Sequence, residues 1–91
     1  MTYQIVYSKT AVSQINYLKA SKLDNKVKQL IELIKENPYQ TPPTYEKLQG
    51  DLSGLYSRRI NIKHRLVYQV LEDEKIIKIL SMWTHYEKGL R

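Results

Sequence analysis

The chain has 91 residues, enough for one small domain and too few for separate cofactor-binding and substrate domains. It contains no cysteine, which excludes disulfides and thiolate metal sites. A formal net charge of +6 favours a polyanionic or an acidic protein partner. Because the sequence has no long apolar run and no basic-then-apolar leader, we expect a cytoplasmic protein with no membrane partner.

The N-terminal half predicts a strand followed by two helices. Apolar residues alternate over residues 3–7, as in a short strand, and Ser8 can cap the helix that follows. One face of that helix is formed by Ala11, Ile15 and Leu18, with Val12 beside them. Ser21 is the next cap candidate. The second helix carries a stripe of 3.6-residue period at Leu23, Val27, Leu30, Ile31 and Ile34. We expect a helical hairpin packed on a sheet; a lysine-lined RNA groove is the weaker alternative.

The C-terminal half predicts strands joined by short turns, which makes them antiparallel. Three prolines end the second helix and stiffen the loop before Glu46, and Gly50 and Gly54 bracket a turn. Strands are expected over 55–62, 65–70 and 76–84, with turns at 63–64 and 72–75. The predicted fold class is therefore α+β: one two-layer domain over residues 1–91, with the N-terminal strand and helical hairpin on a mostly antiparallel β-sheet.

Positive charge is concentrated between Leu52 and Leu71, where the sequence contains no acidic residue. The basic residues of this stretch are Arg58, Arg59, Lys63 and Arg65. Alternation along a strand puts Arg58 and Arg59 on opposite faces, and Arg65 lies on the neighbouring strand. Two or three guanidinium groups on one face would match phosphate oxygens. The alternative is a solvated cationic face without a specific ligand.

Acid–base groups are the remaining source of chemistry, because no metal motif and no glycine-rich phosphate loop occurs; we expect no metal and no cofactor. RNA can be cut when a base removes the 2′-OH proton, cations stabilise the phosphorane and an acid protonates the leaving 5′-oxygen. Glu46, Arg65 and His85 fit these three tasks. The alternative interpretation, without a catalytic role, is that Glu46 is an ordinary surface glutamate and that His85 is a structural histidine at a strand end.

Three segments together resemble a known family. The run from Leu52 to Ile60, then His64–Tyr68, and finally His85–Tyr86 are similar to the Txe/YoeB toxins of the RelE superfamily, which belong to type II toxin–antitoxin modules. The match covers essentially residues 1–86. It implies a RelE-like fold and a ribosome-dependent endoribonuclease, an mRNA interferase that cleaves mRNA in the A site and inhibits translation without a metal.

The resemblance also implies roles for individual residues. Glu46 would accept the proton, His85 donate one, Arg65 stabilise the phosphate and Tyr86 orient the substrate. The remaining RNA-binding candidates are Arg59, Lys47, Arg58 and Lys63. The chain departs from the family pattern at Lys47, Gln49 and Lys63, and in a tail over residues 87–91, which affects the expected rate and codon preference more than the reaction type.

The same resemblance implies partners. These are the 70S ribosome with its mRNA, an acidic antitoxin of the YefM/Axe type, and operator DNA only as part of the toxin–antitoxin complex; monomer and homodimer both stay open. Two other functions fit the sequence. The chain could occupy the A site and block translation without cutting, or it could serve mainly as a subunit captured by the antitoxin, which is compatible with cleavage.

Overall fold

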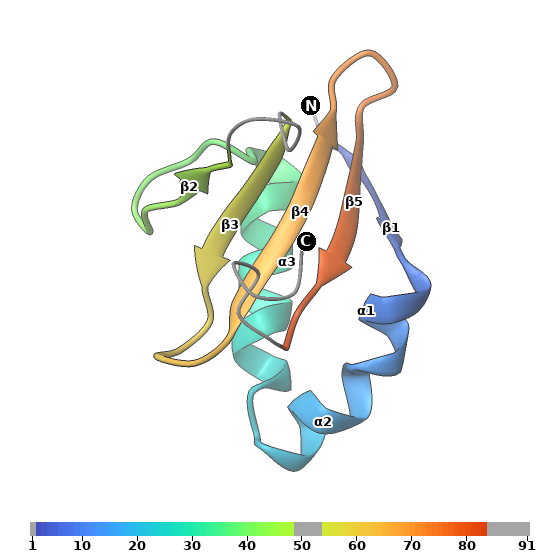
Figure 1. Cartoon of the computed structure of the whole chain (residues 1–91). Helices are drawn as coiled ribbons and strands as arrows, with labels where there is room; N and C mark the ends of the chain where they lie inside the picture. Colours follow the sequence, from blue (N-terminus) through green and yellow to red (C-terminus); the bar gives the residue numbers. More distant parts are fainter. Residues whose placement is uncertain (1, 49–53, 84–91) are drawn as a thin grey trace.

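The computed structural model describes residues 2–48 and 54–83. Figure 1 shows helix α3 lying across one face of a twisted sheet. In chain order the elements are β1 (Gln4–Tyr7), α1 (Lys9–Ser13), α2 (Ile15–Ala20), α3 (Asp24–Glu36), β2 (Glu46–Lys47), β3 (Leu55–Arg59), β4 (Arg65–Leu71) and β5 (Ile76–Ser81). The α+β prediction, with helices on a mostly antiparallel sheet, is confirmed.

The five strands lie in the order β1-β5-β4-β3-β2. Strands β3, β4 and β5 follow one another through short turns and pair antiparallel. Strand β1 pairs parallel with β5, an arrangement that needs a crossover connection. Strand β2 forms the other edge of the sheet and pairs antiparallel with β3, so that Glu46 lies opposite Ser57.

The first helical segment begins as the sequence predicts and is then interrupted. The Ser8 hydroxyl accepts a hydrogen bond from the Ala11 backbone N–H at 3.0 Å, which confirms the N-cap. At Gln14 the segment divides into α1 and α2. The buried Gln14 side chain accepts a hydrogen bond from the Met82 backbone N–H at 2.6 Å, so the break in the helix is tied to the end of β5.

Two details of the predicted hairpin are wrong. Val12 is 54% exposed, because it lies about 100° around the helix from the buried Ala11 and does not share its face. Ser21 ends α2 instead of capping the next helix, which begins at Asp24 with no side-chain cap. The apolar stripe of α3 is confirmed, since its members after position 23 are buried and Leu23 packs against them.

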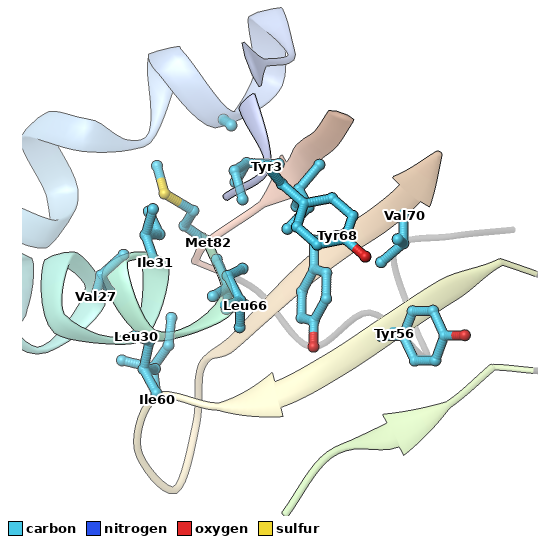
Figure 2. Close-up of a cluster of buried hydrophobic side chains, with 14 of the residues drawn as sticks. Tyr3, Val27, Leu30, Ile31, Tyr56, Ile60, Leu66, Tyr68, Val70 and Met82 are labelled. Atoms are coloured by element: carbon cyan, nitrogen blue, oxygen red, sulfur yellow. The ribbon is translucent and has the colours of Figure 1, made fainter. Parts of the chain in front are cut away.

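The main core lies between α3 and the sheet, as Figure 2 shows. Its fully buried members include Ile34 on α3 and, at or beside the sheet, Ile60, Leu66, Tyr68, Ile77 and Ile79. We call this side of the sheet the helix face. Ile62 was predicted to share it but is 82% exposed, because β3 ends at Arg59 and the chain turns. Strand β5 ends at Ser81, earlier than the predicted residue 84, which lies outside the described residues.

A second, smaller apolar cluster lies on the opposite side of the sheet. It consists of Leu48, Leu55 and Val67, with Leu80 packed against it. Because alternate residues of a strand point to opposite faces, this cluster lies on the same side as Glu46, Ser57 and Arg59. We call this side the site face. No helix within residues 2–48 and 54–83 has the length and apolar character that crossing a membrane requires.

Candidate functional site

Three neighbouring strands bring four polar side chains together on the site face. Glu46 on β2 is paired with Ser57 on β3, and two residues further along β3 Arg59 is paired with Arg65 on β4. Residues two apart on a strand share a face, and paired residues lie about 5 Å apart. The strand register therefore groups Glu46, Ser57, Arg59 and Arg65 in one patch. The sequence predicted three of these residues and missed Ser57.

The Glu46 carboxylate and the Arg65 guanidinium approach each other within this patch. Glu46 Oε1 lies 3.9 Å from Arg65 Nη1, and the two side chains are 62% and 18% exposed. They line a hollow of about 450 Å³ with Ser57 and Arg59, and its remaining lining residues are Pro43, Thr44 and Tyr45. A carboxylate that can take up a proton thus lies beside two fixed positive charges, an arrangement suited to acid–base chemistry on a phosphate.

Arg58 does not belong to this patch, which corrects its assignment as an RNA-binding residue. Its side chain lies on the helix face and is only 1% exposed. The guanidinium donates hydrogen bonds to the backbone oxygens of Pro38, Gln40 and Pro43 at 2.7–3.0 Å. It also donates to the Tyr68 hydroxyl, which in turn donates to the Pro38 oxygen. Through these hydrogen bonds, the buried Arg58 side chain holds in place the loop that leads into β2 and Glu46.

The same loop is fastened at a second point by Glu72, in the turn between β4 and β5. The Glu72 carboxylate accepts hydrogen bonds from the hydroxyls of Tyr39 and Tyr3 and from Lys75 Nζ. These bonds hold the pKa of Glu72 below its ordinary value, and the bond from Tyr39 has the largest effect. Burial is the main cause that raises the pKa of Tyr39, and the bond to Glu72 raises it further. Glu72 therefore links the loop after α3 to the start of β1.

The two lysines predicted to bind RNA are exposed but lie outside the patch. Lys47 pairs with Tyr56, so strand alternation directs it to the face opposite Glu46. Lys63 lies in the turn after β3, where its backbone N–H donates to the Asn61 side chain at 2.8 Å. Neither residue lines the hollow that Glu46 and Arg65 share.

An aromatic stack that the sequence analysis missed lies at the end of β5. Trp83 is stacked on His64 with ring centroids 3.9 Å apart, and on Tyr17 with centroids 5.5 Å apart. His64 lies where a turn was expected, and its stacking on Trp83 connects this turn, before Arg65, to the chain that leaves β5. Only the aromatic character of three residues far apart in the sequence could have hinted at this contact.

The other candidates, His85 and Tyr86, lie outside the described residues, as do Gln49 and the tail over residues 87–91. Within the part of the chain that the structure describes, no three histidine, aspartate or glutamate side chains gather closely enough to hold a metal ion.

Comparisons with solved structures define the class of protein first. A YoeB/ParE toxin from Agrobacterium tumefaciens has a TM-score of 0.82 and 26% identity, covering 91% of this chain and 99% of its own. Staphylococcus aureus YoeB, solved in complex with YefM and as a dimer, is 36% identical with a TM-score of 0.76, covering 94% of this chain and 100% of its own. An archaeal RelE–RelB complex from Pyrococcus horikoshii has a TM-score of 0.75 and 27% identity, covering 92% and 96%. The fold is that of RelE-type toxins.

Sequence comparison narrows this class to one family. Residues 7–86 match the model of the YoeB-like toxin of bacterial type II toxin–antitoxin systems. Toxin YoeB of Mycobacterium bovis is 40% identical over 65 residues, which are 71% of this chain and 74% of the relative. The chain belongs to the YoeB-like toxins of type II toxin–antitoxin systems.

Proposed function

We propose that this toxin is an endoribonuclease that cleaves mRNA in the ribosomal A site and so inhibits translation in the cytoplasm. The observation that carries the proposal is the approach of the Glu46 carboxylate to the Arg65 guanidinium, 3.9 Å apart in a hollow also lined by Arg59. Its membership of the YoeB-like toxins supports the proposal.

In the proposed reaction Glu46 removes the proton of a ribose 2′-OH. The 2′-oxygen then attacks the adjacent phosphorus in line, the bond to the 5′-oxygen of the next nucleotide breaks, and a 2′,3′-cyclic phosphate forms. Arg65 and Arg59 stabilise the additional negative charge on the phosphate oxygens. His85 protonates the leaving 5′-oxygen, and Tyr86 orients the substrate. The chain reaches His85 only two residues after Trp83, whose ring is fixed by stacking on His64, next to Arg65.

The proposed partners follow from charge and from the family. The net charge of +6 and the arginine pair on the site face favour binding to the ribosome and mRNA when the toxin is free. An acidic antitoxin of the YefM type would compete for the same cations, and S. aureus YoeB has been solved with YefM. We propose that operator DNA is bound only through that complex and that the free toxin can form a homodimer.

Primer extension on ribosome-bound mRNA tests the proposal. New 5′ ends within codons are expected with the wild-type toxin, and none with Glu46→Gln or His85→Gln. Glu74→Gln is the matched control, because Glu74 lies in the β4–β5 turn and should leave cleavage unchanged. Stalled but intact message with the wild-type toxin would instead identify a translation blocker that does not cut.

A further inference from the structure

Ser57 is the central residue of the patch on the site face. Its pairing partner on β2 is Glu46 and its partner on β4 is Val67, while Arg59 follows two residues later on its own strand. Arg65 is diagonally adjacent, because it pairs with Arg59. Ser57 therefore lies between the carboxylate and the two guanidinium groups, and it lines the hollow that these groups share.

The Ser57 hydroxyl combines burial with a lack of hydrogen-bond partners. The residue is 1% exposed, and its Oγ forms no hydrogen bond with any residue in 2–48 or 54–83. Buried hydroxyls are nearly always paired, and leaving one unpaired is unfavourable. Arg65 Nε is a second buried donor in the patch without a partner among the described residues. A ligand with several acceptor oxygens would satisfy both donors together.

We propose that Ser57 is a further catalytic residue, whose hydroxyl donates a hydrogen bond to a non-bridging oxygen of the scissile phosphate. This inference rests on the proposed endoribonuclease function. A serine suits the position because its hydroxyl is neutral and does not compete with Glu46 for the 2′-OH proton. The bond strengthens as charge accumulates on the phosphate oxygens, so it stabilises the transition state more than the bound substrate.

The test uses single-turnover cleavage of ribosome-bound mRNA by the full-length toxin. Ser57→Ala is expected to lower the rate constant by about 100- to 1000-fold, as for other donors that contact a developing oxyanion. Ser57→Thr and Ser57→Val form a matched pair of nearly equal shape that differs in the hydroxyl, so Thr should retain activity that Val loses. Ser81→Ala is the control, because Ser81 is a buried strand serine whose hydroxyl accepts from Gln14 instead of facing the hollow.

Sulfur substitution at the cleaved phosphate separates contact from a merely structural effect. One of the two phosphorothioate diastereomers replaces the oxygen that Ser57 contacts. This diastereomer should slow the wild-type toxin more than it slows Ser57→Ala, whereas a structural role would leave the sulfur effect the same in both. Equal sulfur effects in the two proteins, or a wild-type rate for Ser57→Ala, would overturn the catalytic role of Ser57. Cleavage by the wild-type toxin would still support the proposed function in that case. If the wild-type toxin cuts no message at all, the proposed function fails, and the role of Ser57 fails with it.

Discussion

The Glu46 carboxylate and the Arg65 guanidinium lie 3.9 Å apart between Oε1 and Nη1, although their strands, β2 and β4, are not neighbours in the sheet. Adjacent strands are about 4.8 Å apart, so the two side chains must extend toward each other over β3. The residue beneath them is Ser57, whose small side chain leaves room for this approach. The carboxylate and the guanidinium thus face the same hollow, which Ser57 also lines.

The guanidinium of Arg65 is expected to supply a large part of the catalysis. Arg65→Ala should lower kcat/KM by about 30- to 1000-fold, or ~2–4 kcal/mol of transition-state stabilisation, since comparable electrostatic donors contribute this much. Arg65→Lys should recover only part of the loss, because an ammonium group cannot make two parallel bonds to phosphate. Ribosome-dependent cleavage kinetics measure both effects. The control is Lys26→Ala on the exposed surface of α3; a wild-type rate for Arg65→Ala would contradict the role.

Arg59 should show a conflict between function and stability. It lies directly opposite Arg65 in the β3–β4 pair, and like charges at such positions repel each other. Arg59→Gln is therefore expected to raise the free energy of unfolding by a few tenths of a kcal/mol, about the size of a cross-strand pair effect. The same change should weaken mRNA binding and reduce its dependence on salt.

Urea denaturation and cleavage assays at several salt concentrations measure the two effects of Arg59→Gln. Lys47→Gln removes the same charge from the opposite face of the sheet. It should affect RNA binding less than Arg59→Gln and leave stability nearly unchanged. Equal losses of RNA binding in the two variants would mean that the strand register does not determine which cations contact the message.

Periodicity predicted those parts of the fold that depend on one element at a time. The stripe from Val27 to Ile34 indicated which side of α3 is buried, and Ser8 indicated where α1 begins. Alternation likewise put Arg58 and Arg59 on opposite faces of β3. It could not show that the face of Arg58 is covered by the loop after Pro38, because that contact joins residues about 20 positions apart.

Long-range contacts also explain what the sequence analysis missed at the site. Ser57 is an ordinary strand residue until the registers of β2 and β4 bring Glu46 and Arg65 to either side of it. Trp83 meets Tyr17 and His64 only in the folded protein, where the end of β5 lies beside the break between α1 and α2. The acidic and basic candidates were recognisable by residue type, whereas their neighbours depended on the completed sheet.

Arg58 should be required for stability more than for RNA binding. Arg58→Ala removes a buried guanidinium and leaves the carbonyls of Pro38, Gln40 and Pro43 without their donor. We expect a loss of about 3–5 kcal/mol in the free energy of unfolding, as when a buried charged network is broken. Arg58→Lys should restore little, since lysine lacks the planar fork. Urea denaturation checks this, and a loss below 1 kcal/mol, as at an exposed position, would contradict it.

Stability at acidic pH should depend on Glu72. Its pKa in the folded protein is held below the ordinary value near 4.5, chiefly by the Tyr39 hydroxyl. A carboxyl of this kind stabilises the fold above its unfolded pKa, and the contribution is lost as the pH falls through the folded pKa. Glu72→Gln should therefore be less stable than wild type at pH 7, and the difference should shrink below about pH 4.5.

Thermal unfolding between pH 3 and pH 7 measures the difference between wild type and Glu72→Gln. Glu74→Gln is the matched control, because Glu74 lies in the same turn and forms no side-chain hydrogen bond or ion pair with the described residues. If Glu72→Gln is less stable than wild type by the same amount at every pH in this range, the shape of the Glu72 side chain, and not its charge, links Tyr39 to the turn.

The stack of Tyr17, Trp83 and His64 is expected to support catalysis from outside the hollow. Tyr17→Ala removes one face of the stack and should cost about 0.5–1.5 kcal/mol of stability, the usual value of an aromatic pair. Because Trp83 lies two residues before the proposed acid His85 in the sequence, loosening its ring should lower kcat more than it raises KM. Tyr7→Ala is the matched control, since Tyr7 is another exposed tyrosine and is not part of the stack. Single-turnover cleavage measures the effect, and an unchanged kcat in Tyr17→Ala would separate the stack from the chemistry. Trp83→Phe should keep more activity than Trp83→Ala, because a smaller ring can still stack on His64 at the contact nearest Arg65.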